Sequence, residues 1–203
     1  MIDHFADLSK MVGGRRMNVY RRIDINTDDF RVGDQISIGH YTATCQKIEG
    51  DGCIFLLDQY LDEAMSMNEE DTNKGGYEAS DLIIELNSDE ILKVFDGLKL
   101  TPFKNGDLLR IPYYGEMFGH DGWYRSSGVE PDDCEQWVLM MDRRNRVADR
   151  RGEAYEWGWL QNKQVRSLTT FSDVDNDGTA GYWDASNSIG VRPVFKINCE
   201  VDE

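Results

Sequence analysis

The sequence predicts an α+β fold in which a few strands and two short helices stand among long ordered loops. Strand-like patterns fill residues 34–57, a helical period fills residues 77–98, and residues 102–158 are aromatic, glycine-punctuated and irregular. Loops of that length are uncommon in compact domains and tend to be functional. The chain has 203 residues, 40 % of them hydrophobic and 11 % aromatic, which is enough material for one well-packed domain.

The strand-rich region begins with two segments separated by a bulge or tight bend. Within residues 34–48 the apolar positions change parity at Gly39-His40, which predicts that bend. Residues 49–52 (EGDG) have the composition of a hairpin turn, and they lead into residues 53–57 (CIFLL), which read as a buried strand.

The later elements are two helices and two further strands. Residues 77–98 predict helix, with Ser80 as the cap of the first turn and Asn87-Ser88 as the point where the helix divides in two. A regular strand is expected within residues 134–147 (CEQWVLMMDRRNRV), and a near-continuous apolar strand closes the domain at residues 190–197 (GVRPVFKI).

The charge balance is strongly acidic, with 38 acidic against 22 basic residues and a net charge of -16. Such a surface repels phosphate backbones, so we expect no nucleic-acid partner. Two basic stretches, residues 15–22 and 142–151, are expected to be solvated or to pair with acids of the same chain. No apolar run approaches the roughly 20 residues that span a bilayer, so no membrane insertion is expected.

The N-terminal residues differ in texture from the rest of the chain. Residues 1–29 read as a charged leader with a break at Gly13-Gly14, placed as a docking or assembly arm would be, and residues 30–203 read as the domain. The start of the chain has acids where a secretory signal has bases. Four cysteines without a Cys-x-x-Cys pair predict thiols in a reducing compartment, most of them buried.

The sequence contains no familiar catalytic motif. It has no Gly-x-Ser-x-Gly elbow, no His-Glu-x-x-His and no phosphate-binding glycine loop. Its three histidines, His4, His40 and His120, have no companions at metal-ligand spacing, and His120 is expected to pair with Asp121 or Glu116 in a loop. We therefore expect a protein that is not an enzyme and uses no cofactor.

The segment DVDNDGTAGYWD fits the spacing of a calcium loop. Asp173, Asp175, Asp177 and Asp184 would supply carboxylates, and Gly178 the sharp turn. The flanking sequence argues against an EF-hand, because the entry (RSLTTFS) is rich in β-branched and small residues and the exit leads into a strand with a proline. A calcium-dependent binding module of another kind remains an alternative.

A second pattern overlaps the first in the same segment. A few widely spaced residues form a frame, and the residues between them share neither a helical or strand periodicity nor a common polarity. The frame consists of Phe171, Val174, Gly178, Gly190, Val191, Arg192 and Pro193. The residues expected to point outward as a ligand-binding surface are Leu168, Thr169, Thr170, Ser172, Asp173, Asp175, Asn176, Asp177, Thr179, Gly181, Tyr182, Asp184, Asn187 and Ile189.

This frame, F-x-x-V-x-x-x-G followed by A-x-x-x-x-G-V-R-P, comes after the aromatic W-G-W-L of residues 157–160. It resembles the C-type-lectin-fold variable proteins that are targets of diversity-generating retroelements in phages and gut bacteria. It also resembles a related domain family of gut bacteria and their phages. VGDQISIGHY, YEASDL and LRIPYYGEMFG precede the frame in the order of that pattern, so the resemblance covers about residues 30–197.

The resemblance implies a C-type-lectin-like fold with small antiparallel sheets. A core strand would run from Gly190 to Phe195, with Arg192 tied into the loops. Mutagenesis of template adenines scatters Asn-type codons into many residue types, which would produce an Asp-rich segment without selection for calcium. Trp183 does not fit that mechanism. The family's W-W-L-R-S-P reads W-L-Q-N-K from Trp159 onward, which leaves open whether Gln161 and Asn162 belong to the surface.

The expected function is therefore recognition of a ligand. The partner would be a protein or glycan on a cell surface, and the protein would be encoded by a phage or prophage and found in a virion or in the cytoplasm. Tyr182 and Trp183 would supply rigid contact area, while Trp157 and Trp159 are expected in the core. A homo-oligomer is left open, and an enzyme of the fold of sulfatase-modifying proteins is a further alternative.

Overall fold

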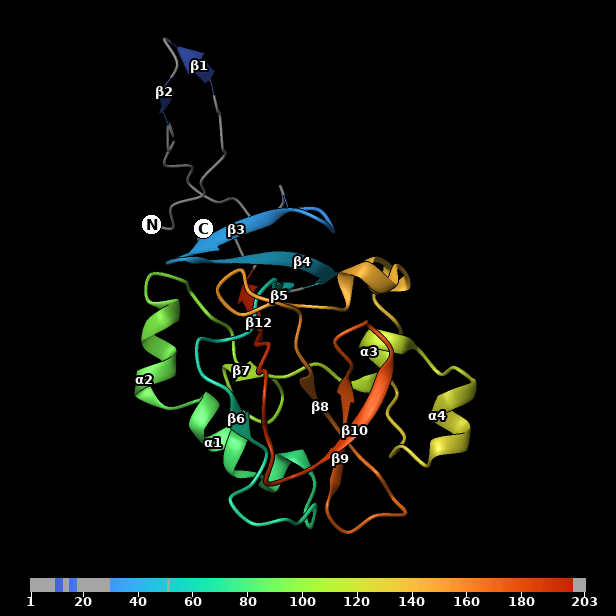
Figure 1. Ribbon diagram of the computed structural model, residues 1–203. Helices are drawn as coiled ribbons and strands as arrows, with labels where there is room; N and C mark the ends of the chain where they lie inside the picture. Colours follow the sequence, from blue (N-terminus) through green and yellow to red (C-terminus); the bar gives the residue numbers. More distant parts are fainter. Residues whose placement is uncertain (1–9, 13–14, 18–29, 51, 199–203) are drawn as a thin grey trace.

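The computed structural model describes residues 10–12, 15–17, 30–50 and 52–198, and within them it contains both helices and small antiparallel sheets (Figure 1). The predicted α+β class is confirmed. The predicted leader, residues 1–29, lies outside the described residues except for strands β1 (Lys10–Val12) and β2 (Arg15–Met17), which pair with each other. Within the described part of the chain, no helix is long and apolar enough to cross a membrane.

The largest sheet has five antiparallel strands in the order β3-β4-β5-β12-β7. Its strands are β3 (Gln35–Ile38), β4 (Tyr41–Glu49), β5 (Gly52–Leu57), β7 (Leu109–Arg110) and β12 (Val194–Asn198). The last strand, β12, thus lies between a strand from the first third of the chain and one from the middle. This arrangement closes the domain, because β12 pairs with both β5 and β7.

The local sequence explains the first three strands. Gly39, at φ +60°, turns the chain between β3 and β4, so the predicted bend at Gly39-His40 is a tight turn. The bulge lies further on, at Gln46, where the pairing of β4 with β5 skips one residue. β5 is buried at all six positions, as its continuous apolar run predicts.

The two predicted helices are confirmed, together with their boundary. Ser80 caps α1 (Asp81–Leu86) by accepting a hydrogen bond from the backbone N–H of Ile83. Ser88 caps α2 (Asp89–Leu92) in the same way, and a 3-10 turn, η3 (Lys93–Phe95), continues it. Serine favours the N-cap because its side chain satisfies an amide that the helix leaves without a partner.

The irregular middle of the chain contains short helical turns. They are α3 (Tyr114–Phe118), α4 (Gly122–Ser127), η4 (Val138–Met141) and η5 (Arg143–Asn145), and a further 3-10 turn, η2 (Tyr77–Ala79), precedes α1. The strand predicted within residues 134–147 is wrong. Trp137 and Met140, three residues apart, are buried, whereas Val138 and Met141 are exposed, which is the spacing of a helical turn.

A second sheet of three antiparallel strands has the order β10-β9-β8. Its strands are β8 (Gly158–Lys163), β9 (Thr170–Val174) and β10 (Ala180–Asp184), and a separate pair joins β6 (Met65–Ser66) to β11 (Ser188–Ile189). The sheet separates two hydrophobic cores. Phe171 and Trp159 belong to the core that also holds Phe195, while Val174 and Leu160 belong to the other.

Candidate functional site

The segment with the calcium-loop pattern is a β-hairpin. β9 pairs with β10 so that Phe171 is opposite Trp183, and Asp173 is opposite Gly181. The connecting turn is closed by two backbone hydrogen bonds, from Asp175 N to Thr179 O at 2.7 Å and from Gly178 N to Asp175 O at 2.8 Å. Gly178 has φ +81°, a conformation that glycine adopts without strain. The residues from Asp175 to Gly178 therefore form a turn.

Most of the predicted ligand-binding residues reach solvent on this hairpin and its flanks. The exposed ones are Leu168, Asn176, Asp177, Thr179 and Tyr182. The half-buried ones are Thr169, Thr170, Asp175, Gly181, Asp184 and Asn187. We call these eleven residues together with Trp157 and Trp183 the hairpin surface. Four of them, Gly181 to Asp184, lie on β10, which has a neighbouring strand on one side only and no buried residue.

Three of the predicted surface residues are buried, which corrects the expectation that all of them point outward. Ser172 and Asp173 are inaccessible to solvent because β9 lies between β8 and β10, with Phe171 in one hydrophobic core and Val174 in the other. Ile189 is buried because β11 pairs with β6 and brings this side chain into the larger core. Gln161 and Asn162, whose place was open, are also buried.

The carboxyl group of Asp173 lies in an unusual environment. Neither oxygen has a hydrogen-bond partner of normal geometry in the described part of the chain. Burial, and to a smaller degree the charge of Asp175, raises its pKa to about 8, against a weaker opposing effect of the backbone amides of Gly181 and of Asp173 itself. A Cβ on Gly181 would lie close against Oδ1, so this glycine makes room for the carboxyl group.

Two tryptophans form the aromatic part of the hairpin surface. Trp157 and Trp183 pack edge to face, with ring centroids 5.8 Å apart and planes at 70°, and the indole N–H of Trp157 donates to Asp175. The expectation that Trp157 is a core residue is wrong, since it is 37 % exposed, whereas Trp159 is buried and donates to Met65 O. Tyr182, next to Trp183 on β10, is 60 % exposed.

The four aspartates of the calcium hypothesis do not converge. Asp184 accepts a hydrogen bond from the hydroxyl of Thr169, Asp177 pairs with Arg143, and Asp173 is buried in β9, ahead of the turn. Among residues 30–50 and 52–198, no three His, Cys, Asp or Glu side chains are grouped so that they could hold one metal ion. The geometry brings together too few carboxylates for a calcium cage.

The seven frame residues are all buried. Arg192 anchors the frame: its Nε donates to Leu57 O, and its Nη1 donates to Asn145 O and Arg146 O at 3.2 Å each. The core strand implied for Gly190 to Phe195 starts later, at Val194, because Pro193 lacks the N–H that a central strand needs. Gly190 instead lies against Tyr60, where an added Cβ would come within 2.6 Å of the ring.

The basic stretch at residues 142–151 serves as the partner for acids of the same chain, as predicted. Arg143 binds Asp177 of the hairpin turn, and Arg146 donates to Gly178 O at 3.4 Å. No local pattern indicated that these arginines would reach the hairpin, because Arg143 and Asp177 are 34 positions apart in the chain and meet only in the fold.

Histidine and cysteine each depart in part from expectation. His120 does not pair with Asp121 or Glu116; its Nε2 lies 3.0 Å from Asp132 O, because the loop after α4 folds back onto α3. Cys45 and Cys53 are buried thiols and Cys134 is partly buried, whereas Cys199 lies outside the described residues. Burial raises the pKa of the Cys134 thiol to about 12, which makes it a poor nucleophile.

Comparison of the chain with family models, with curated proteins and with solved structures gives no match. Function is therefore inferred from the chemistry of the hairpin surface and from the frame that holds it.

Proposed function

We propose that this protein is a non-enzymatic ligand-recognition protein whose hairpin surface binds a protein or glycan on a cell surface. The observation that carries the proposal is the contrast within residues 168–193. Seven frame residues are buried, and eleven of the fourteen residues between and beside them reach solvent. Such a segment can change its exposed side chains while its backbone stays anchored.

The chemistry of the hairpin surface suits recognition. Tyr182, Trp157 and Trp183 offer large rigid contact areas that lose little conformational entropy on binding. Asn, Asp and Thr side chains beside them offer hydrogen bonds that adapt to different partners. Substitutions at exposed positions usually change stability by no more than about 0.5 kcal/mol, so this surface can vary without unfolding the domain.

The proposal includes a C-type-lectin-like fold and diversification by a retroelement in a phage or prophage. What supports this part is the order of motifs that precede the G-V-R-P of residues 190–193. The test is genomic. A reverse-transcriptase gene and a near-copy of the DNA for residues 168–193, differing at adenines, are expected beside the gene. Their absence from the complete genome would refute diversification and leave the binding role to its own test.

The binding role is tested with the full chain, labelled with a fluorophore, on a microbial glycan array and on intact gut bacteria. Binding is expected to be saturable and to fall at least about tenfold, equivalent to about 1.4 kcal/mol, in Tyr182→Ala or Trp183→Ala. Ile84→Ala is the matched control, since Ile84 is a 71 % exposed apolar residue on α1, outside the hairpin. Equal loss in all three variants, or no loss in any, would contradict the assignment of the hairpin surface.

A further inference from the structure

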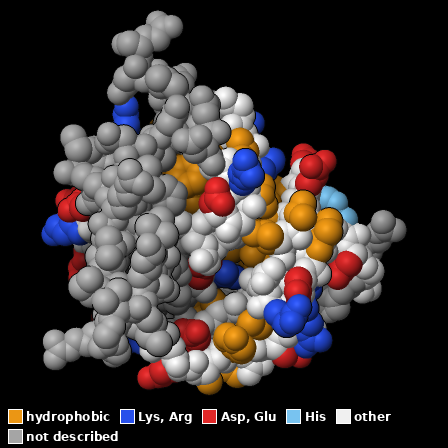
Figure 2. Space-filling model, turned by 90° about the horizontal axis from the view of Figure 1, so that it is seen from above, with side chains coloured by type: hydrophobic (Ala, Val, Ile, Leu, Met, Phe, Trp, Pro, Cys, Tyr) orange, Lys and Arg blue, Asp and Glu red, His pale blue; other side chains and the backbone are white. Residues whose placement is uncertain are grey.

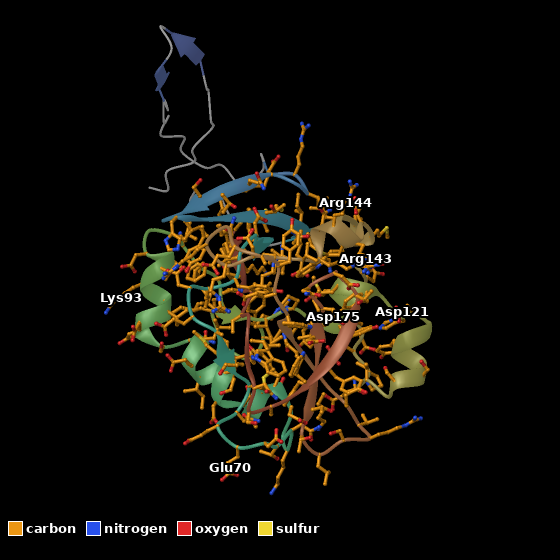
Figure 3. The ribbon with its side chains drawn as sticks, in the orientation of Figure 1. Glu70, Lys93, Asp121, Arg143, Arg144 and Asp175 are labelled. Carbon is orange, nitrogen blue, oxygen red and sulfur yellow. The ribbon has the colours of Figure 1, made fainter. Side chains whose placement is uncertain are left out.

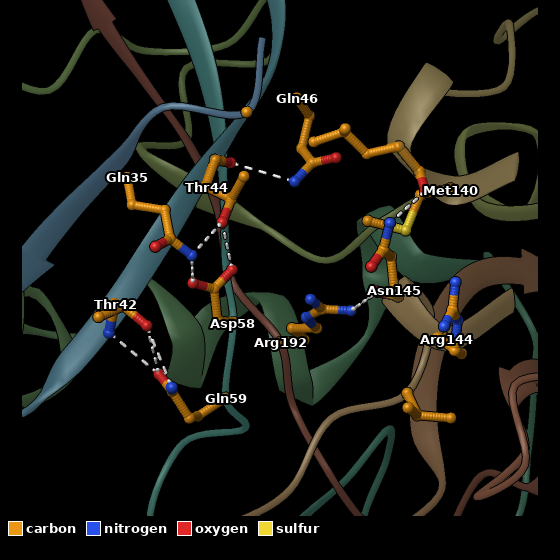
Figure 4. Close-up of a pocket in the computed structure, with 13 residues that line it drawn as sticks. Gln35, Thr42, Thr44, Gln46, Asp58, Gln59, Met140, Arg144, Asn145 and Arg192 are labelled. Atoms are coloured by element: carbon orange, nitrogen blue, oxygen red, sulfur yellow. Dashed lines mark hydrogen bonds between the residues drawn. The ribbon is translucent and has the colours of Figure 1, made fainter. Parts of the chain in front are cut away.

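A polar groove of about 530 Å³ lies apart from the hairpin surface, between the β3–β4 hairpin and residues 138–147 (Figure 4). Its volume is within the range of small-molecule sites, roughly 300–1,000 Å³. One wall consists of Gln35, Thr42, Thr44, Gln46, Asp58 and Gln59. The other wall, from η4, η5 and the residues beside them, consists of Leu139, Met140, Arg144, Asn145 and Val147, and Arg192 lies between the two.

Figure 2 looks down from above onto the face that carries β3 and β4. Where side chains are drawn, acidic, basic and apolar groups alternate around a hollow in the surface.

Gln46 provides an acceptor that needs a donor. This side chain is only 3 % exposed, its Nε2 donates to Thr44 O at 3.1 Å, and its Oε1 has no hydrogen-bond partner in the described part of the chain. A buried acceptor left unsatisfied is unfavourable, because it loses its hydrogen bond to water and gains none in the protein. Gln46 is also the bulged residue of β4, and bulges redirect side chains next to functional sites. Gln46 lines the groove (Figure 4).

Arg192 provides a donor that no described side chain or carbonyl uses. Its Nε and Nη1 are used by backbone carbonyls, but Nη2 has no acceptor among the described residues, and no carboxylate there lies within ion-pair distance. Asp58 is the acid whose charge acts on Arg192, and its two oxygens already accept from Thr44 Oγ1 at 2.6 Å and Gln35 Nε2 at 3.0 Å. Arg144, at the rim, is paired with Asp142.

A hydroxyl group donates and accepts at once, so it can satisfy both Gln46 and Arg192. The carboxylate of Asp58 offsets the charge of Arg192, and Arg144 is paired with Asp142, so the groove has no excess positive charge that would select an anionic ligand. Leu139, Met140 and Val147 offer aliphatic surface to C–H groups. We propose that the polar groove binds a small neutral polyol, such as one sugar unit, with one hydroxyl donating to Gln46 Oε1 and another accepting from Arg192 Nη2. This site is separate from the hairpin surface and does not depend on the function proposed for it.

The test is an NMR titration of the isotope-labelled full chain with glucose, galactose and mannose, and with the methyl glycoside of each. The two sets of compounds distinguish a free sugar from the terminal unit of a glycan, because the terminal unit has a substituted anomeric carbon, as a methyl glycoside has. Preferred binding of the methyl glycosides would indicate a glycan end, and preferred binding of the free sugars a soluble ligand. At least one sugar is expected to give saturable shifts within residues 33–46, at Asp58 and Gln59, and within 139–147. Sodium glucuronate and inorganic phosphate are expected to bind at least about tenfold more weakly.

Gln46→Met removes the acceptor and retains the volume, and it also removes an unsatisfied buried group, so the variant is expected to fold. It should weaken sugar binding at least about tenfold, whereas Lys93→Met, an exposed change away from the groove (Figure 3), should leave it unchanged. Three results would each overturn the proposal: no saturable binding of any neutral sugar, preferred binding of glucuronate or phosphate, or sugar-induced shifts outside the groove. Should the methionine variant fail to fold, the map of shifts in the unmodified chain decides.

Discussion

The five-stranded sheet and the β9–β10 hairpin are both antiparallel, yet their side chains differ in how far they are buried. Every residue of β5 is buried, as are residues 194–197 of β12, whereas no residue of β10 is buried. β5 and β12 have a paired strand on each side, and β10 has one on one side only. An edge position alone does not decide exposure, since β8, the other edge of the second sheet, is buried at five of its six positions. What covers a strand therefore decides which residues are constrained by packing and which are available to a ligand.

Strand β9 lies between the buried strand β8 and the exposed strand β10. Its side chains fill two cores while its partner β10 faces solvent. A buried strand next to an exposed one gives the hairpin surface a rigid base. Substitutions should therefore destabilise the protein most in the five-stranded sheet and least on β10.

The largest effect is expected from an aromatic side chain in the five-stranded sheet. Phe195 packs between Phe55 and Phe95, at ring-centroid distances of 5.6 Å and 5.2 Å. Phe195→Ala should lower the free energy of unfolding by about 3–5 kcal/mol, because it leaves a cavity that rigid neighbours cannot fill. Urea unfolding measures this. Trp183→Ala, which loses an exposed edge-to-face contact, should lower the free energy of unfolding by no more than about 1.5 kcal/mol. Equal losses in the two variants would show that the sheet and the hairpin do not differ in how packing constrains them.

The next effect concerns the glycine at the start of G-V-R-P. In Gly190→Ala the new Cβ would come within 2.6 Å of the ring of Tyr60, which is 1 % exposed and cannot move away. We expect a loss of about 1–3 kcal/mol in the free energy of unfolding. Gly50→Ala is the control, since a Cβ there meets nothing within 4 Å. A neutral Gly190→Ala would show that the frame tolerates change as the hairpin surface does.

Asp173 predicts a dependence of stability on pH. Its pKa is about 8 in the folded protein, against 3.8 for a carboxyl group exposed to water, so the folded state holds the proton more tightly. The free energy of unfolding should therefore fall as pH rises from about 4 to 8, by at most about 1.4 kcal/mol per pH unit from this group. Urea unfolding at pH 5, 6 and 7 is the measurement. Asp173→Asn should flatten that slope, and an unchanged slope would contradict the assignment.

The smallest effect is expected on the hairpin surface. Tyr182→Ser should change the free energy of unfolding by no more than about 0.5 kcal/mol, because the side chain is 60 % exposed on an edge strand. Thermal and urea unfolding measure this. Ser172→Tyr, at the paired position on β9, is the matched change in the buried strand and should be strongly destabilising. Similar stability of the two variants would show that β9 and β10 do not differ in their constraint by packing.

Elements with a strong local signal were predictable from the sequence. The apolar run of β5, the serine caps of α1 and α2, and the turn at Gly39-His40 each reflect a property of neighbouring residues. The region 134–147 misled because its apolar residues are nearly consecutive, and only the spacing of Trp137 and Met140 carried the helical signal. The burial of Asp173 could not be predicted from its polar side chain, because that burial results from pairing with Gly181 and Trp159.

By itself the sequence determined the α+β class, the positions of the first strands and the two capped helices, and the distinction between a sparse apolar frame and the polar residues around it. Only the tertiary structure decided which strand became the edge, which aspartate was buried, and that Gln46 and Arg192 line one groove. The physical reason is the separation along the sequence over which each kind of interaction acts. Caps, turns and periodicity act between residues a few positions apart, whereas burial and hydrogen-bond satisfaction depend on segments that folding brings together from distant parts of the chain.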